Sequence, residues 1–180
     1  MPQITTSCKT DTPLIDASLI SHGTLTSLDL QASRRFYEEV LGLEVIQVST
    51  VSLNIRKGSG HVYVVVETGE PSSMGMFDHN GIDVGTRDAV DKAYENLVAV
   101  KEEYGLGRIH KPTDQHGMYS FYFSDLDGNW WEIQQGVAGG NATLFGDPKT
   151  DFTGRTEIDD EMMQHIFDTD LTLKENKDQP

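Results

Sequence analysis

The run His22-Gly-Thr-Leu-Thr-Ser-Leu-Asp-Leu30 leads into a helical pattern of residues, and the run His79-Asn-Gly-Ile-Asp-Val84 leads into a second one. The two histidines are 57 residues apart (79 − 22). At that offset four helix residues of one run match four of the other: Tyr37 with Tyr94, Glu38 with Glu95, Val40 with Leu97, and Leu41 with Val98. A strand-entry histidine followed twice by an amphipathic helix in the same register indicates internal duplication.

Each copy ends in a predicted β-hairpin. The first joins Val51-Ser-Leu-Asn-Ile55 through Lys57-Gly-Ser-Gly60 to His61-Val-Tyr-Val-Val-Val-Glu67. The second joins Met118-Tyr-Ser-Phe-Tyr-Phe-Ser124 through Asp125-Leu-Asp-Gly128 to Asn129-Trp-Trp-Glu-Ile-Gln-Gln135. β-Rich runs around a glycine turn are typical of hairpins. Superposing the turns places Glu132 at the position that Val64 has in the first copy.

The chain of 180 residues is an ordinary length for one domain. We expect an N-terminal arm over residues 1–19 and a single domain over 20–135, made of two modules at 20–70 and 76–135. Pro71-Ser-Ser-Met-Gly75 separates the modules. A tail follows at 136–180, with a short helix near residues 159–167.

Composition excludes several classes of partner. The net charge of −15 argues against nucleic acid and anionic membranes, which both require clustered Lys and Arg. The single cysteine, Cys8, excludes an intramolecular disulfide and suits a reducing cytoplasm. No apolar run is long enough for a membrane span, and the N-terminus lacks the pattern of a signal peptide. We expect a cytoplasmic protein.

Three residues are candidate metal ligands: His22, His79 and Glu132. Two imidazoles and one carboxylate suit divalent ions such as Fe(II), Mn(II), Ni(II) and Zn(II), and leave coordination positions open. Alternation along the last strand puts Glu132 on one face with Trp130 and Gln134, where an unpaired buried charge would need a cation. Taken singly, each histidine also fits a hydrogen-bonded structural residue, and the glutamate a solvent-facing one.

Two segments resemble the vicinal oxygen chelate superfamily, which includes glyoxalase I, extradiol dioxygenases, fosfomycin-resistance enzymes and bleomycin-binding proteins. They are Leu28-Asp-Leu-Gln-Ala-Ser-Arg-Arg-Phe-Tyr-Glu-Glu-Val-Leu-Gly-Leu43 and Phe123-Ser-Asp-Leu-Asp-Gly-Asn-Trp-Trp-Glu-Ile133. The resemblance covers about residues 20–135. It implies an α+β fold of two βαβββ modules that form a half-open barrel around a metal. Fold and function separate readily, so the chemistry must come from the site.

The set of predicted ligands favours one type of enzyme within the superfamily. Glyoxalase-type sites take a fourth ligand from the position that is Val64 here, and Glu67, three residues on, falls on the opposite face of a regular strand. The remaining triad is similar to the iron site of type I extradiol dioxygenases. The same resemblance implies that His61 acts as an acid and base, and that Tyr122 hydrogen-bonds the substrate. Taken alone, His61 also fits a hairpin cap and Tyr122 a core aromatic.

The resulting expectation is an Fe2+-dependent dioxygenase, with Mn2+ as an alternative ion, that cleaves a catechol-type ring with O2. The chain departs from many such enzymes in having one copy of the domain, and a homodimer or higher oligomer is our default. A glyoxalase-like isomerase or lyase and a metal-free binding or resistance protein stay open. His116 and Asp114 precede the Tyr122 strand and are weaker candidates for the pocket, whereas His110 and His165 belong to no recognisable motif.

Overall fold

The computed structural model describes residues 5–15, 17–58, 60–115, 118–136, 142, 145 and 151–155. The helix expected near residues 159–167 lies outside this part of the chain. The first module contains β1 (His22–Ser27), α1 (Leu30–Glu39), β2 (Glu44–Ser49), β3 (Ser52–Arg56) and β4 (Val62–Glu67). The second contains η1 (Met76–Asp78), β5 (Asn80–Val84), α2 (Arg87–Tyr104), β6 (Thr113–Gln115), β7 (Met118–Ser124) and β8 (Trp130–Gln135). Both predicted hairpins are confirmed.

The two modules have the same sheet topology. One sheet has the order β1-β4-β3-β2 and the other β5-β8-β7-β6. The central pair is parallel in each, with Thr24 opposite Val64 in the first sheet and Gly81 opposite Glu132 in the second. Thr24 and Gly81 differ by the same 57 positions as the two histidines. The duplication, the α+β class and the equivalence of Val64 with Glu132 are therefore confirmed.

The helices begin at equivalent residues but end differently. Asp29 accepts a hydrogen bond from the backbone N of Ala32, and Thr86, 57 residues later, accepts one from Ala89. Such caps satisfy N–H groups that have no partner within the helix. The expectation that Val40 and Leu41 lie in the first helix was wrong, because α1 ends at Glu39. The second helix continues to Tyr104 and stops at Gly105, whose φ of 66° is in the left-handed region.

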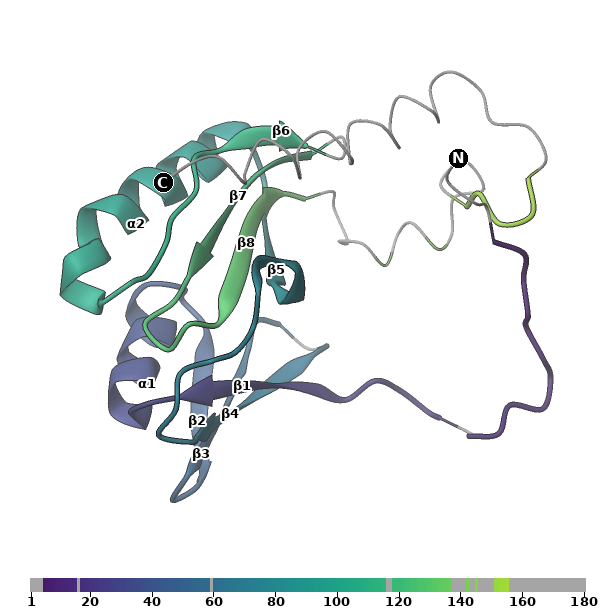
Figure 1. The fold of residues 1–180 in the computed structure, drawn as a ribbon, viewed down its shortest axis with the longest axis horizontal. Coiled ribbons are helices and arrows are strands. Elements are labelled where there is room, and N and C mark those ends of the chain that lie inside the picture. Colours follow the sequence, from purple (N-terminus) through teal and green to yellow (C-terminus); the bar gives the residue numbers. More distant parts are fainter. Residues whose placement is uncertain are drawn as a thin grey trace.

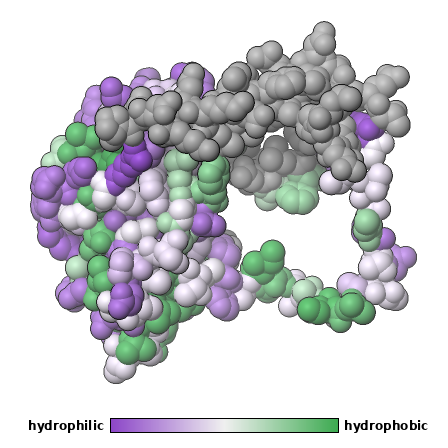
Figure 2. Space-filling view, in the orientation of Figure 1, coloured by the Kyte–Doolittle hydropathy of each residue, from purple (hydrophilic) through white to green (hydrophobic). Residues whose placement is uncertain are grey.

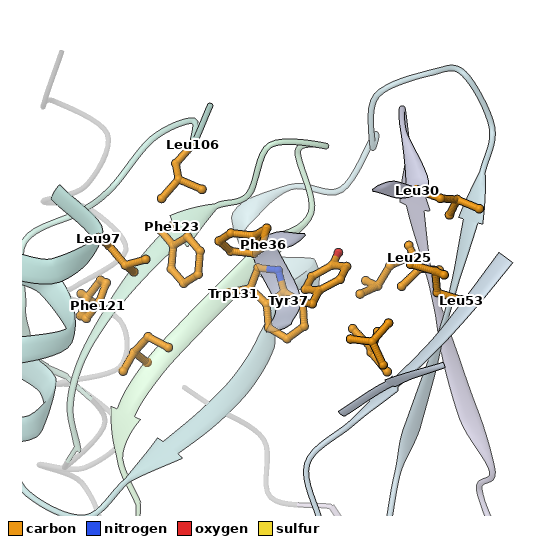
Figure 3. Close-up of a cluster of buried hydrophobic side chains, with 14 of the residues drawn as sticks. Leu25, Leu30, Phe36, Tyr37, Leu53, Leu97, Leu106, Phe121, Phe123 and Trp131 are labelled. Carbon is orange, nitrogen blue, oxygen red and sulfur yellow. The ribbon is translucent and has the colours of Figure 1, made fainter. Parts of the chain in front are cut away.

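Both helices lie on the same side of the two sheets (Figure 1). Their apolar side chains and the sheet residues that face them form one core that crosses from module to module (Figure 3). Phe36 and Tyr37 of α1 are fully buried there, and the Tyr37 ring packs edge-on against Trp131 of β8. We call the other side of the sheets the open face. It carries the alternate residues: His22, Thr24, Asn54, Val62 and Val64 in the first sheet, and Gly81, Tyr122 and Glu132 in the second.

The turn between β7 and β8 fastens the second module to the first. Asn129 is fully buried, donates a hydrogen bond to the carbonyl of Thr26 at 2.9 Å, and accepts one from the Thr26 backbone N at 3.2 Å. Asp127 accepts from the backbone N of Leu28 at 2.8 Å and from the Ser33 hydroxyl at 2.6 Å. The Asp-Leu-Asp-Gly-Asn segment of the sequence thus forms hydrogen bonds between the two modules, and β8 starts directly after it.

The described part of the N-terminal arm leaves the domain (Figure 1). Figure 2 shows apolar groups along it that are separate from the domain surface. Leu14 and Ile20 are examples, with exposed fractions of 104% and 86%. Within the described residues, no helix is both long and apolar enough to span a membrane.

Candidate metal centre

His79 and Glu132 meet on the open face of the second sheet. The Nε2 atom of His79 lies 3.3 Å from Oε2 of Glu132. The other ring nitrogen, Nδ1, lies 2.7 Å from the carbonyl oxygen of Met76, so it is the nitrogen that carries a proton when the ring is neutral. A ligating histidine commonly donates its other N–H to a carbonyl, which leaves the opposite nitrogen free to bind a metal. His79 is held in this way.

Glu132 is a buried carboxyl group, with an exposed fraction of 8%. Burial raises its pKa, but hydrogen bonds from His79, Ser120 and Tyr122 lower it by more, so the pKa of Glu132 lies below the ordinary value. Ser120 and Tyr122 supply hydrogen-bond donors to this carboxylate, and His79 does so when its ring is protonated. That a metal cation binds here stays a prediction.

Tyr122 lies beside the pair on β7. Its ring centroid is 4.8 Å from that of His79, and its hydroxyl hydrogen-bonds Glu132. Burial raises the pKa of Tyr122, and the neighbouring Glu132 charge raises it further. The hydroxyl therefore stays protonated at neutral pH and donates its one hydrogen bond to Glu132.

His22 stands apart from this cluster. It is the first residue of β1, is exposed, and its Nδ1 lies 2.8 Å from the Ser21 hydroxyl. No group of three or more His, Cys, Asp or Glu side chains in the described residues is arranged to hold a metal ion. The structure therefore brings two of the three predicted ligands together, and the convergence of His22 with them stays a prediction.

His61 also lies outside the cluster. Its ring packs edge-on against Tyr63, with the ring centroids 4.8 Å apart. A Cβ atom built on Gly23 would lie 3.5 Å from His61 Nε2 and 2.9 Å from Tyr63 Cε1. Because Gly23 alternates with His22 along β1, His61 lies over the face of that strand opposite to the one His22 occupies. Its predicted role as an acid and base stays a prediction.

The other residues singled out in the sequence contact groups outside the cluster of His79, Glu132 and Tyr122. Glu67 accepts a hydrogen bond from the backbone N of Leu30 at 3.1 Å, at the positive N-terminal end of α1. Asp114 pairs with Arg87 at 2.6 Å on the surface. The ring of His110 lies 5.8 Å from that of Trp130. His116 and His165 lie outside the described residues.

Two polar residues that support Glu132 were not predicted from the sequence. Ser120 hydrogen-bonds the Glu132 carboxylate, and Gln115 in turn donates to the Ser120 hydroxyl at 2.8 Å. All three are buried. The signal was available, since Ser120 lies two positions before Tyr122 and alternation puts both on the face of Glu132. Nothing in the sequence, however, pairs Gln115 with Ser120.

The two donor residues of this cluster, His79 and Glu132, fit a divalent metal ion. One imidazole nitrogen and one carboxylate face each other at close range, and both have hydrogen bonds that fix their orientation. Nitrogen and oxygen donors of this kind suit Fe(II), Mn(II) and Zn(II). The sequence repeat predicts His22, on the open face of the neighbouring sheet, as the third ligand.

Comparison with solved structures shows the same fold. "Structure of a possible Glyoxalase from Bacillus cereus" is 25% identical, with a TM-score of 0.53, covering 65% of this chain and 98% of that one. A hypothetical protein from S. aureus is 25% identical, with a TM-score of 0.52 and coverages of 68% and 99%. A mutant fosfomycin resistance protein, FosX, from Listeria monocytogenes, complexed with Mn(II) and a dihydroxypropylphosphonic acid, is 22% identical, with a TM-score of 0.55 and coverages of 67% and 92%.

Comparison with curated protein sequences gives no match. Comparison with protein families gives one over residues 19–133, which is more than half of the chain and spans both modules. The chain therefore belongs to the Glyoxalase/Bleomycin resistance protein/Dioxygenase superfamily.

Proposed function

We propose that this protein is a non-haem Fe(II)-dependent extradiol dioxygenase, which cleaves the ring of a catechol-type substrate with O2. The observation that carries the proposal is the contact between His79 and Glu132 on the open face, with the Tyr122 hydroxyl beside it. A histidine, a carboxylate and a protonated phenol in one cluster suit the binding of a metal and of an acidic diol.

His22, His79 and Glu132 would hold the ion. His22 opens β1, which among the described strands pairs with β4 alone, and the described part of the arm before it is exposed. This end of β1 is therefore held on one side alone, and it can adjust towards His79 and Glu132 when a metal binds, since metal binding supplies free energy that orders its ligands. Bound ferrous iron would supply open coordination positions for the two diol oxygens and for O2.

The residues of the chain then have distinct tasks. The Met76 carbonyl holds the Nδ1 proton of His79, which keeps Nε2 directed at the metal position. Ser120 and Gln115 fix the Glu132 carboxylate. The Tyr122 hydroxyl, which donates to Glu132 in this structure, would donate instead to a substrate oxygen and stabilise negative charge on it once Glu132 binds the metal. His61, to which the resemblance gives the role of acid and base, lies over the opposite face of β1 from His22, so no step of the proposal is assigned to it.

The test is direct. The protein is purified anaerobically, loaded with ferrous iron and mixed with catechol in air-saturated buffer. We expect oxygen uptake equal to the substrate consumed and a yellow ring-opened product. Oxygen uptake without ring opening, or no uptake by iron-loaded protein, would contradict the proposal.

A glyoxalase-like isomerase or lyase is the second candidate, favoured by the likeness to the possible glyoxalase from Bacillus cereus. It would need a fourth donor at the position of Val64, whose side chain is apolar, and Glu67 is turned towards α1 instead. Activity with zinc or nickel, without oxygen uptake, would favour this function over the first.

A further inference from the structure

A pocket of about 220 Å³ lies on the first sheet. It is lined by Glu44, Ile46, Asn54, Ile55, Arg56 and Val62. All of these except Ile55 are open-face positions by strand alternation. Val62 is the register partner of His22 in the β1–β4 pair. The pocket therefore begins one strand away from the predicted ligand His22, on the same face.

Asn54 is the unusual residue of this pocket. It lies in the middle of the sheet, with Ile46 opposite it on β2 and Val64 on β4. Its side-chain oxygen is shielded from solvent and has no hydrogen-bond partner among the described residues. Buried polar atoms nearly always have a partner, and leaving one unpaired is costly. A few placed polar groups among apolar side chains are typical of small-molecule sites.

We propose that this pocket binds the ring substituent of the diol substrate, and that Asn54 selects substituents with a neutral hydrogen-bonding group, such as an amide or a ketone. The inference rests on the proposed function and narrows its substrate class. A cavity of about 150 Å³ is large enough for benzene, so the pocket can take a substituent of several heavy atoms. Because its oxygen is shielded from solvent, Asn54 must turn its carboxamide to present that oxygen to a ligand, and the same rotation lets the group serve as donor or acceptor.

Charge argues for a neutral group rather than a carboxylate. The only cation in the lining is Arg56, and its Nε and one terminal nitrogen both donate to Oε2 of Glu44, at 3.0 and 2.8 Å. The pair leaves the rim without net charge, and the chain as a whole carries −15. An anionic substituent would have to compete with Glu44 for the guanidinium group, whereas an amide or ketone needs only Asn54.

The first experiment does not depend on the metal. The full chain, without added metal, is titrated with benzamide and followed by two-dimensional ¹H–¹⁵N NMR. We expect shifts at Asn54, Ile46 and Val62, and at least tenfold weaker binding to Asn54→Leu, which corresponds to about 1.4 kcal/mol. Asn96→Leu is the matched control, because Asn96 lines a different pocket, formed by α2, the end of α1 and the second sheet. This variant should bind benzamide like the wild type.

The second experiment uses turnover. The ratio of kcat/KM for 3,4-dihydroxybenzamide to that for 4-ethylcatechol, two substrates of similar size, should exceed one and fall at least tenfold in Asn54→Leu. The ratio for 3,4-dihydroxybenzoate to 4-ethylcatechol should lie below one. All three substrates share the diol and the metal. The effect of each substituent on the reactivity of the ring cancels when the ratio in Asn54→Leu is divided by the ratio in the wild type, so the change in the ratio reports the contact with Asn54.

A stability measurement excludes a purely structural role. If Asn54 serves a ligand, Asn54→Leu should unfold at the same or a higher temperature, because it removes an unpaired polar group. A lower unfolding temperature would show that Asn54 stabilises the fold and would overturn the proposal. The proposal would also be overturned if benzamide caused the same shifts in Asn54→Leu. It would be overturned as well if benzamide caused no shifts at Asn54, Ile46 and Val62 in a protein that cleaves catechol. Benzamide binding at Asn54 without any ring cleavage would keep the pocket and reject only the dioxygenase.

Discussion

Nε2 of His79 lies 3.3 Å from Oε2 of Glu132, although His79 directly precedes β5 and Glu132 lies in β8. The parallel pairing of β5 with β8 causes this, because it sets Gly81 opposite Glu132 and so brings the residue two positions before Gly81 near the carboxylate. The equivalent position to Glu132 in the first sheet is Val64. Duplication therefore supplied two histidines, while one copy alone carries the carboxylate.

Replacing Tyr122 with Phe should lower kcat for catechol by about 10²–10³-fold, as removal of a charge-stabilising donor does in other enzymes. The Tyr122 hydroxyl stays protonated because burial raises its pKa. Steady-state kinetics on iron-loaded protein checks this. Tyr119→Phe is the control, since Tyr119 donates instead to Asp91 on the surface. Equal losses in both variants would contradict the role given to Tyr122.

Asn129→Ala should destabilise the protein by roughly 2–4 kcal/mol, because it leaves both backbone groups of Thr26 without their Asn129 partners in a buried setting. Urea denaturation measures the change. Asn96→Ala, at an exposed helix position, should fall within about 0.5 kcal/mol of the wild type. If the two variants unfold alike, the β7–β8 turn does not hold the modules together.

Asp125 should make stability depend on pH in an unusual direction. Burial raises the pKa of Asp125 from 3.8 to about 6, despite hydrogen bonds from Trp131 and Asn129 that lower it. Because the folded pKa lies above the unfolded one, this contribution is fully present below about pH 4 and is lost as pH rises through about 6. The loss is on the order of 3 kcal/mol. The free energy of unfolding of the wild type minus that of Asp125→Asn should fall over this range; a difference that rises with pH would contradict the assignment.

Iron affinity should fall as pH decreases through the pKa of His79. That pKa is raised, chiefly by the hydrogen bond with Glu132. A metal ion must displace the proton on Nε2 of the charged His79 ring. Metal binding is therefore favoured above the raised pKa and opposed below it. Titration of the anaerobic protein with ferrous iron at several pH values measures the dependence. An affinity that is constant from pH 5 to pH 8 would show that His79 is not a ligand.

The repeat is what made the fold predictable. The 57-residue offset predicted two copies of one strand-and-helix unit, and superposing the two hairpin turns predicted the equivalence of Val64 with Glu132. The match of Val40 with Leu97 did not show where α1 ends, but Gly42, with a φ of 61°, follows that end, and its counterpart 57 residues later is Ala99.

The site was predictable only in part. His79, Glu132 and Tyr122 meet because the pairing within one sheet places them together, and such pairing follows from alternation. The positions of His22 and His61 depend on how one sheet is set against the other and on a hairpin entry, which periodicity does not specify. The role of Glu67 at the start of α1 depends likewise on the connection from β1 to the helix.

Iron content measured per chain, in protein loaded anaerobically and then desalted, tests the central claim most directly. The wild type should hold about one iron, and His22→Ala, His79→Ala and Glu132→Gln should each lose it, since three protein ligands are needed. Glu67→Gln should keep it, because Glu67 contacts α1. Retention of iron by His22→Ala, or its loss from Glu67→Gln, would contradict the proposed metal centre.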